Sequence, residues 1–481
     1  MNTLLMNVIS KMGERKLNMD YDSYNCVYPF KYNSPECSII IDNLNGSIKG
    51  QHNIASIYLG FDNSNVLNSG RLESLLKIQL MSNPLEFLKI LLDKGDVAID
   101  NEEGTLTMST IITRLNIKLE VDPDSLLPKK AVVQESDFLL GDTNFEVVYG
   151  NWVQVNDVKY PTEITHLFRN QALRKEVLSN IELNPEINED TFTPLETDVP
   201  NLYNIVDAKK GMLFSQWYQR MFYMNLTLDQ SLFPAFVLEN VNLSQFNLRN
   251  QYVGENIKII GRPDVSVWSV AIKTDRGIYI VDSPISPSWS RSIINAAKEA
   301  FPEDNVVGVI PTHVHGTHFS GIRELSSEVS DIYVGSGSAS FVDEVLMSDH
   351  TLVPDTFSSN NSNPMIHTIE NKILIDGGEI EAYVLKTQNY PTNPHSEDLV
   401  VVYVPEYKAL IQADFYYAGI AENIFKGLTA SPFSEEVKQS LKSRAQFLLS
   451  FIQEKKLDVE NVIGVHGGLT TMDELVSVSN Y

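Results

Sequence analysis

The sequence contains very little cysteine and no long apolar run. Only two of its 481 residues are cysteines, Cys26 and Cys37, and both lie near the N-terminus. Neither a disulfide framework nor a thiolate metal cage can therefore hold the body of the protein together, although one bridge between the two cysteines is left open. The most apolar stretch, residues 75–92, is interrupted by charged and amide side chains, whereas a bilayer span needs about 18 apolar residues. We expect no transmembrane segment.

Basic residues are also scarce. There are 37 Lys and Arg against 62 Asp and Glu, which gives a net charge of −25 and leaves no basic stripe to attract a phosphate backbone. We therefore expect a small-molecule substrate, of hydrophobic character if the charge reflects the pocket, and no nucleic-acid partner. Residues 1–20 have no secretion-signal pattern, so the expected location is cytoplasmic as numbered, or periplasmic or secreted if a leader was removed. Homo-oligomer formation is left open.

The length of the chain predicts two domains, because single domains usually contain roughly 100–200 residues. The pattern changes near residues 200–210, and we predict an N-terminal α+β domain over 1–235 and a second domain over 236–481. A linking helix is expected at about 205–230. Its aromatic and methionine side chains at helical spacing, in 211–226, indicate a core-facing helix or an interdomain lid, with a hydrophobic substrate channel as the alternative.

The N-terminal half contains one well-marked helix followed by several short strands. Asn83-Pro84 precedes Glu86 at capping-box spacing and Gly95 follows, which predicts a helix from Asn83 to Lys94. Short β-branched and aromatic segments separated by turn residues then predict an antiparallel sheet. The expected strands are Thr105–Ile112, Asn116–Val121, Lys129–Gln134, Asn144–Tyr149 and Gln154–Tyr160.

The order of three segments in this half resembles bacterial lipoprotein-carrier proteins. The segments are DPDSLLPKKAVV, GDTNFEVVYGNWVQVNDVKYPTEI and NIELNPEINEDTFTPL, within about Thr105 to Leu195. The resemblance rests on pattern more than on specific residues. It implies a curved antiparallel sheet that wraps an apolar ligand, and the alternative is a scaffold or interface domain.

The second half, from about Val253, alternates apolar strands with helices, which predicts a layered α/β domain. Three histidines, His313, His315 and His318, directly follow the apolar strand VVGVI. Neutral imidazole is a common ligand for zinc and iron, so this cluster suggests a metal site. Further candidate ligands lie at the ends of later strands, where sheets present side chains at their rim. His395 comes just before a strand, and Asp414 and His466 end two others.

The ordered pattern HxHxxH, His, Asp, His resembles the metallo-β-lactamase superfamily over about Val253 to Gly468. The resemblance implies an αββα sandwich and a site for one or two Zn²⁺ ions, with iron or manganese as alternatives. It also implies that Asp282, at an early strand end, orients a ligand imidazole; the alternative is that Asp282 caps a turn before Pro284. The implied ligands are His313, His315 and His395 for a first metal, Asp414 as a bridge, and His318 and His466 for a second metal.

The sequence departs from the family motif at Thr317. The motif HxHxDH reads H-V-H-G-T-H here, so a neutral hydroxyl replaces a carboxylate that serves the second metal. A threonine hydroxyl is a weak ligand and cannot act as a carboxylate base at neutral pH. We therefore expect the second metal to bind more weakly than the first.

The expected chemistry is hydrolysis of an ester, lactone or amide by metal-bound hydroxide. The predicted catalytic residues are Asp414, His466 and Thr317, with Thr317 forming a hydrogen bond to a metal-bound water. Two alternatives stay open: a non-hydrolytic metalloenzyme, such as an iron oxygenase or biosynthetic tailoring enzyme, and a non-catalytic protein that binds an apolar ligand through a degraded metal site.

Overall fold

The structure, a computed structural model, describes residues 78–188 and 251–481 apart from short gaps, of which 263–266, 387–397 and 428–434 are the longest. It also assigns strands between residues 4 and 50: β1 (Leu4–Lys11), β2 (Glu14–Tyr21), β3 (Tyr24–Asn25), β4 (Lys31–Tyr32), β5 (Glu36–Asp42) and β6 (Asn45–Gly50). The order β1-β2-β5-β6 forms an antiparallel sheet. The chain divides into two compact units, the first containing α3 and β7–β13 and the second every element from β14 onward. The expected linking helix and the boundary at residues 235 and 236 lie outside the described residues.

The predicted helix near residue 83 is confirmed as α3 (Pro84–Lys94). Its capping box is present: the Glu86 amide donates to Asn83 Oδ1 at 3.3 Å, and Asn83 Nδ2 donates to Glu86 Oε2 at 3.1 Å. One turn in, Phe87 is fully buried in an apolar cluster with sheet residues such as Val133 and Phe145. The cap therefore fixes where the helix begins, and the apolar face fixes it on the sheet.

The first unit contains a seven-stranded antiparallel sheet in which neighbours along the chain are neighbours in space, in the order β13-β12-β11-β10-β9-β8-β7. Its strands are β7 (Ala98–Glu102), β8 (Thr105–Ile112), β9 (Leu115–Val121), β10 (Pro128–Asp137), β11 (Gly141–Val155), β12 (Val158–Phe168) and β13 (Gln171–Val177). This confirms the predicted antiparallel sheet. The resemblance to lipoprotein carriers and the apolar ligand stay predictions.

One predicted strand, Gln154–Tyr160, is wrong. In the structure β11 ends at Val155 and β12 begins at Val158, so the segment spans a hairpin turn. Asn156 has a left-handed φ of 52°, a conformation that Asn adopts more readily than most residues and that tight hairpins require. Residues on both sides of this two-residue turn alternate as in a strand, so the sequence pattern predicted one continuous strand.

The second unit contains two sheets, with orders β14-β15-β16-β17-β18-β19-β20 and β21-β22-β23-β24-β25-β26. The first comprises β14 (Gln251–Val253), β15 (Ile257–Arg262), β16 (Val267–Lys273), β17 (Ile278–Val281), β18 (Val306–Ile310), β19 (Asp331–Gly335) and β20 (Met365–Ile369). The second comprises β21 (Lys372–Ile375), β22 (Ile380–Lys386), β23 (Asp398–Val404), β24 (Ala409–Gln412), β25 (Asn461–Gly464) and β26 (Gly468–Thr471). The helices are α6 (Pro287–Ala300), α7 (Gly316–Phe319), α8 (Ile322–Ser326), α9 (Ala339–Met347), α10 (Thr356–Asn360), α11 (Ala421–Phe425), α12 (Glu435–Lys455) and α13 (Met472–Asn480).

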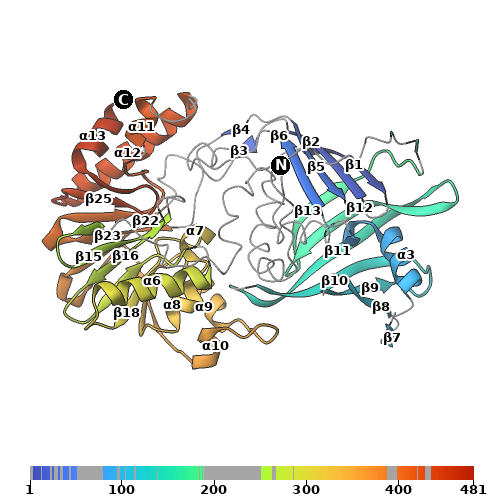
Figure 1. The fold of residues 1–481 in the computed structure, drawn as a ribbon, viewed down its shortest axis with the longest axis horizontal. Coiled ribbons are helices and arrows are strands. Elements are labelled where there is room, and N and C mark those ends of the chain that lie inside the picture. Colours follow the sequence, from blue (N-terminus) through green and yellow to red (C-terminus); the bar gives the residue numbers. More distant parts are fainter. Residues whose placement is uncertain are drawn as a thin grey trace. The chain divides into compact units, whose positions relative to one another are not determined.

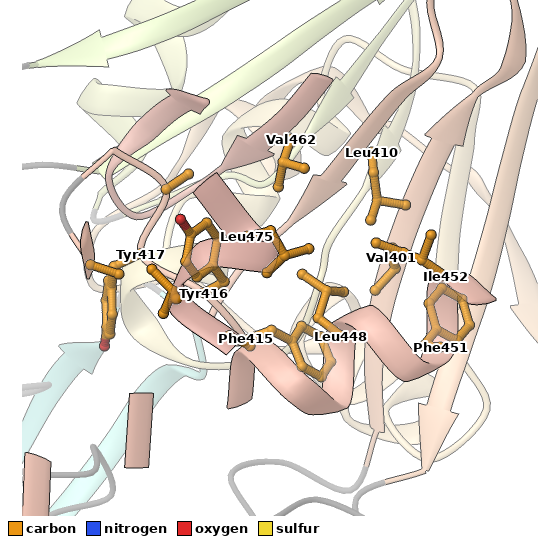
Figure 2. Packing of buried hydrophobic residues seen from close by; sticks show 14 of the residues in the cluster. Val401, Leu410, Phe415, Tyr416, Tyr417, Leu448, Phe451, Ile452, Val462 and Leu475 are labelled. Carbon is orange, nitrogen blue, oxygen red and sulfur yellow. The ribbon is translucent and has the colours of Figure 1, made fainter. Parts of the chain in front are cut away.

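The two sheets pack face to face, and helices cover their outer faces. One apolar cluster joins both sheets, with Ile259 and Val281 from the first and Val402 and Ile411 from the second. A second cluster joins the outer face of the second sheet to α12 and α13, as Figure 2 shows for Val401, Leu448 and Leu475, among others. Figure 1 shows α6 and α8 on the outer side of the first sheet. This unit is thus an αββα sandwich, as expected. None of the helices in the described ranges combines the length and apolar character needed to cross a bilayer.

The layered packing brings the ends of several strands to one edge. Strands β17 and β18 are parallel, as are β24 and β25, so the residues that follow each pair lie at the same end of their sheet. The two sheets meet at this edge, where Val267 pairs with His466 and the Trp268 amide donates to the Val465 carbonyl at 2.9 Å. Loops that follow four different strands therefore converge on one place.

Candidate metal centre

Asp282 holds the loop that carries the first histidines. It directly follows β17, is fully buried and has a left-handed φ of 65°. Its carboxylate accepts hydrogen bonds from the Thr312 amide at 2.6 Å and from the Thr312 hydroxyl at 2.9 Å. The backbone just before His313 is therefore fixed by a buried charge from the neighbouring strand.

The three clustered histidines lie close together after β18. His313 and His318 are buried and His315 is half-buried. The ring of His313 lies 4.6 Å from that of His315 and 4.2 Å from that of His318, measured between centroids. His318 lies in the short helix α7, where its Nδ1 donates to Asp282 Oδ2 at 2.7 Å. This bond leaves Nε2 of His318 as the nitrogen that can bind a metal.

Asp414, which follows β24, faces histidines of both groups. Its Oδ2 lies 3.3 Å from His313 Nε2, while its Oδ1 lies 3.4 Å from His318 Nε2 and 3.1 Å from His466 Nε2. The carboxylate is fully buried. Each of its two oxygens therefore points to a different set of imidazoles, which is the arrangement of a bridging ligand.

These donors fit a metal ion in chemistry and in spacing. Two groups have ligand atoms within 4.8 Å of one another: His313, His315 and Asp414, and His318, Asp414 and His466. In the second group the Nε2 atoms of His318 and His466 are 3.1 Å apart. Bonds of about 2.0–2.1 Å to a tetrahedral zinc place two ligand atoms roughly 3.3–3.4 Å apart, close to these separations. Imidazole and carboxylate together suit zinc, iron or manganese.

The pKa values of the two innermost histidines shift in opposite directions. Burial, together with the nearby His318, lowers the pKa of His313 well below its usual value, so its ring is neutral at pH 7. Burial alone would also lower the pKa of His318, but the carboxylates of Asp414 and Asp282 raise it to about 10. A cation between these carboxylates is therefore favoured, and a metal ion would take the place of the proton on His318.

Comparison with known proteins matches part of this unit to a family. The family model for the metallo-beta-lactamase superfamily matches residues 262–448. The metallo-beta-lactamase type 2 of Bacillus sp. (strain 170) is 22% identical over 205 residues, which cover 42% of this chain and 70% of the relative. Residues 262–448 form a metallo-beta-lactamase superfamily domain.

Similar solved structures are also metallo-beta-lactamases. That of Pontibacter korlensis has a TM-score of 0.34 and 16% identity, covering 48% of this chain and 96% of that one. The FIM-1 enzyme of Pseudomonas aeruginosa in its mono-zinc form has a TM-score of 0.31 and 13% identity, covering 47% of this chain and 88% of that one. The matched residues 262–448 lie within the second unit, and the family match does not extend to the N-terminal region.

In the second unit, five of the predicted ligands lie together: His313, His315, His318, Asp414 and His466. The first four lie within the matched residues 262–448, and His466 follows them. The sixth, His395, lies outside the described residues. Thr317 lies in α7 between His315 and His318 and is buried. Among the other described histidines, His166 contacts Glu176 at 2.9 Å and His367 contacts Asp331 at 2.6 Å, in keeping with structural roles.

The sequence pattern did not identify the residues that hold the Asp414 loop. Arg444 of α12 donates to the Asp414 carbonyl, and Glu474 of α13 accepts a hydrogen bond from Tyr416. Neither residue belongs to a ligand motif in the sequence. Only their distance from Asp414 in space distinguishes them.

Proposed function

We propose that this chain is a metal-dependent hydrolase that acts on an ester, lactone or amide. The observation that carries the proposal is the position of Asp414, a fully buried carboxylate whose two oxygens face two histidine groups at 3.1–3.4 Å. Burying a carboxylate among several imidazoles costs folding free energy unless a cation compensates the charge. The matching superfamily domain supports the same conclusion.

In this proposal His313, His315 and His395 would hold a first ion, His318 and His466 would hold a second, and Asp414 would serve both. A divalent metal there would lower the pKa of bound water to roughly 7 and polarise a carbonyl oxygen. Zinc is the proposed metal, as one or two ions, with iron or manganese as alternatives.

The protein's own residues supply orientation and charge. The Asp282 carboxylate keeps the proton of His318 on Nδ1 and so directs Nε2 toward Asp414. Asp414 supplies negative charge between the two histidine groups. At Thr317 a neutral hydroxyl takes the place of a further carboxylate, so we propose that it holds a water by hydrogen bonding and that the second ion binds more weakly.

The substrate that we propose is a small molecule of neutral or apolar character. The net charge of −25 disfavours polyanions at long range. The reacting bond would be a carbonyl ester, lactone or amide, which metal-dependent hydrolysis suits. No described residue outside the metal cluster narrows the substrate to one of these three bond types.

The test is the metal content and the activity of the full chain purified without added metal. We expect one to two equivalents of zinc and hydrolysis of a chromogenic ester, a simple lactone or a β-lactam amide. His466→Ala should reduce both metal content and turnover, while His367→Gln, which changes a histidine paired with Asp331, should reduce neither. Metal-free protein without turnover would overturn the proposal, and bound iron with oxygen consumption would favour the non-hydrolytic alternative.

A further inference from the structure

The loop that carries Asp414 is anchored in the core of the domain. Phe415 and Tyr416, the two residues after Asp414, are almost completely buried in the apolar cluster between the second sheet and α12 and α13 (Figure 2). The side chain of Gln412, also fully buried, accepts from the Tyr416 amide at 3.0 Å and donates to the Tyr416 carbonyl at 2.6 Å. The backbone on both sides of Asp414 is thus fixed by contacts away from the metal centre.

A buried cation contacts the backbone of Asp414 itself. Arg444 of α12 is fully buried, and its Nη1 donates to the main-chain carbonyl of Asp414 at 2.5 Å. Hydrogen bonds from a charged donor are roughly twice as strong as neutral ones. A guanidinium is costly to bury unless it is hydrogen-bonded. Removing it would leave the Asp414 carbonyl without this strong donor in apolar surroundings.

A second contact joins the Asp414 loop to the strand after His466. Glu474 of α13 accepts from the Tyr416 hydroxyl at 2.6 Å and from the Gly419 amide at 3.0 Å. Its other oxygen accepts from the hydroxyl of Thr470, which lies in β26 just after the His466 turn. One carboxylate therefore ties together the two segments that carry Asp414 and His466.

The backbones of the segments that carry Asp414 and His466 are also in direct van der Waals contact. Gly467 has a φ of 101°, and a Cβ placed on it would lie 2.2 Å from the Ala418 carbonyl oxygen. Only glycine fits such an approach of backbone to backbone. A shift of the Asp414 loop would therefore be passed directly to the His466 turn.

We propose that Arg444 and Glu474 are positioning residues that set the Asp414 carboxylate at its distance from His466. Neither side chain is a ligand. Both act through the backbone of the Asp414 loop, and their effect is on the affinity for the metal ion. The inference rests on the proposed function, because it concerns the ion that Asp414 and the histidines would hold.

The experiment measures zinc affinity of the full chain by competition with a chromogenic chelator, together with the absorption spectrum of the cobalt-loaded protein. Arg444→Met should weaken zinc binding by roughly 10–100-fold, the usual effect of losing an outer partner of a metal ligand, and should shift the cobalt spectrum. Arg444→Lys keeps the positive charge but lacks the planar set of guanidinium N–H donors, so it should recover part of the zinc affinity. Tyr416→Phe removes only the hydroxyl bonded to Glu474 and should give a smaller loss in a protein that folds.

Arg323→Met is the matched control. Arg323 is also buried, pairs with Asp355 and donates to the Val345 carbonyl at 2.6 Å. It lies in α8 beside the first sheet, whereas Arg444 lies in α12 beside the second (Figure 1). The Arg323→Met substitution should lower the melting temperature without changing the zinc affinity or the cobalt spectrum. Equal losses in the Arg323 and Arg444 variants, or an unchanged affinity in Arg444→Met and Tyr416→Phe, would overturn the inference alone. Failure of the unmodified chain to bind zinc or cobalt would overturn the proposed function and the inference with it.

Discussion

The substitution Asp282→Asn offers a direct test of how the metal centre is organised. It keeps the shape of a fully buried side chain but replaces one acceptor oxygen by an NH₂ donor. The aspartate accepts three hydrogen bonds, from the Thr312 amide at 2.6 Å, the Thr312 hydroxyl at 2.9 Å and His318 Nδ1 at 2.7 Å. Asparagine tolerates the left-handed φ of 65° as well as aspartate does, so backbone strain should not change.

The expected loss follows from which bonds the amide can keep. Its oxygen can retain the short bond to the Thr312 amide, which leaves the NH₂ group facing His318 Nδ1. Two donors cannot bond, so the ring must move its proton to Nε2, the nitrogen that faces Asp414 and His466. A protonated Nε2 cannot bind a metal. We expect zinc affinity at this group to fall roughly 10–100-fold, or about 1.4–2.8 kcal/mol.

A stepwise zinc titration against a chromogenic chelator measures this loss, and urea unfolding of the metal-free protein measures the accompanying change in stability. Loss of the charge-assisted bond to His318 should lower the free energy of unfolding by about 1.5–3 kcal/mol. Ser269→Ala is the control, because Ser269 Oγ donates to the main-chain carbonyl of Asp282 at 3.0 Å and not to its carboxylate. If Asp282→Asn bound zinc as tightly as the natural protein, or Ser269→Ala lost as much affinity, the tautomer argument would be refuted.

Three further predictions follow from single residues. Thr317→Asp should tighten binding of a second zinc equivalent in a calorimetric titration, and two equally tight equivalents in both proteins would show that Thr317 is not at a ligand position. Burial would raise the pKa of Asp355, but hydrogen bonds from Arg323 lower it to about 2, so its ionised form stabilises the fold by about 1–2 kcal/mol above pH 4 after solvent screening. That contribution is lost as the pH falls from 4 to 2, and urea unfolding of Asp355→Asn should show a flatter acid dependence, whereas an unchanged profile would contradict the shift. Phe87→Ala should cost about 3–5 kcal/mol of unfolding free energy, against well under 1 kcal/mol for Val153→Ala at a side chain that is 41% exposed.

Local patterns in the sequence determined the elements and the order of the candidate ligands. The capping box at Asn83 and Glu86 predicted α3, since those atoms are three residues apart and bond within one turn. Histidines placed directly after apolar strands predicted a site at the edge of a sheet. The two-residue turn after Val155 was missed, because two common polar residues between alternating strand residues carry a weak local signal.

Only the tertiary structure decided how these residues act together. Asp414 lies 101 residues after His313 (414 − 313), and no local rule states that its two oxygens face different histidine groups. The same holds for Arg444 and Glu474, which belong to no motif in the sequence. Only the packing of α12 and α13 against the second sheet buries Arg444 and places Glu474, half-buried, beside the Asp414 loop. Backbone propensities act over a few residues, whereas the position of a buried charge depends on layers that meet only when the whole domain is folded.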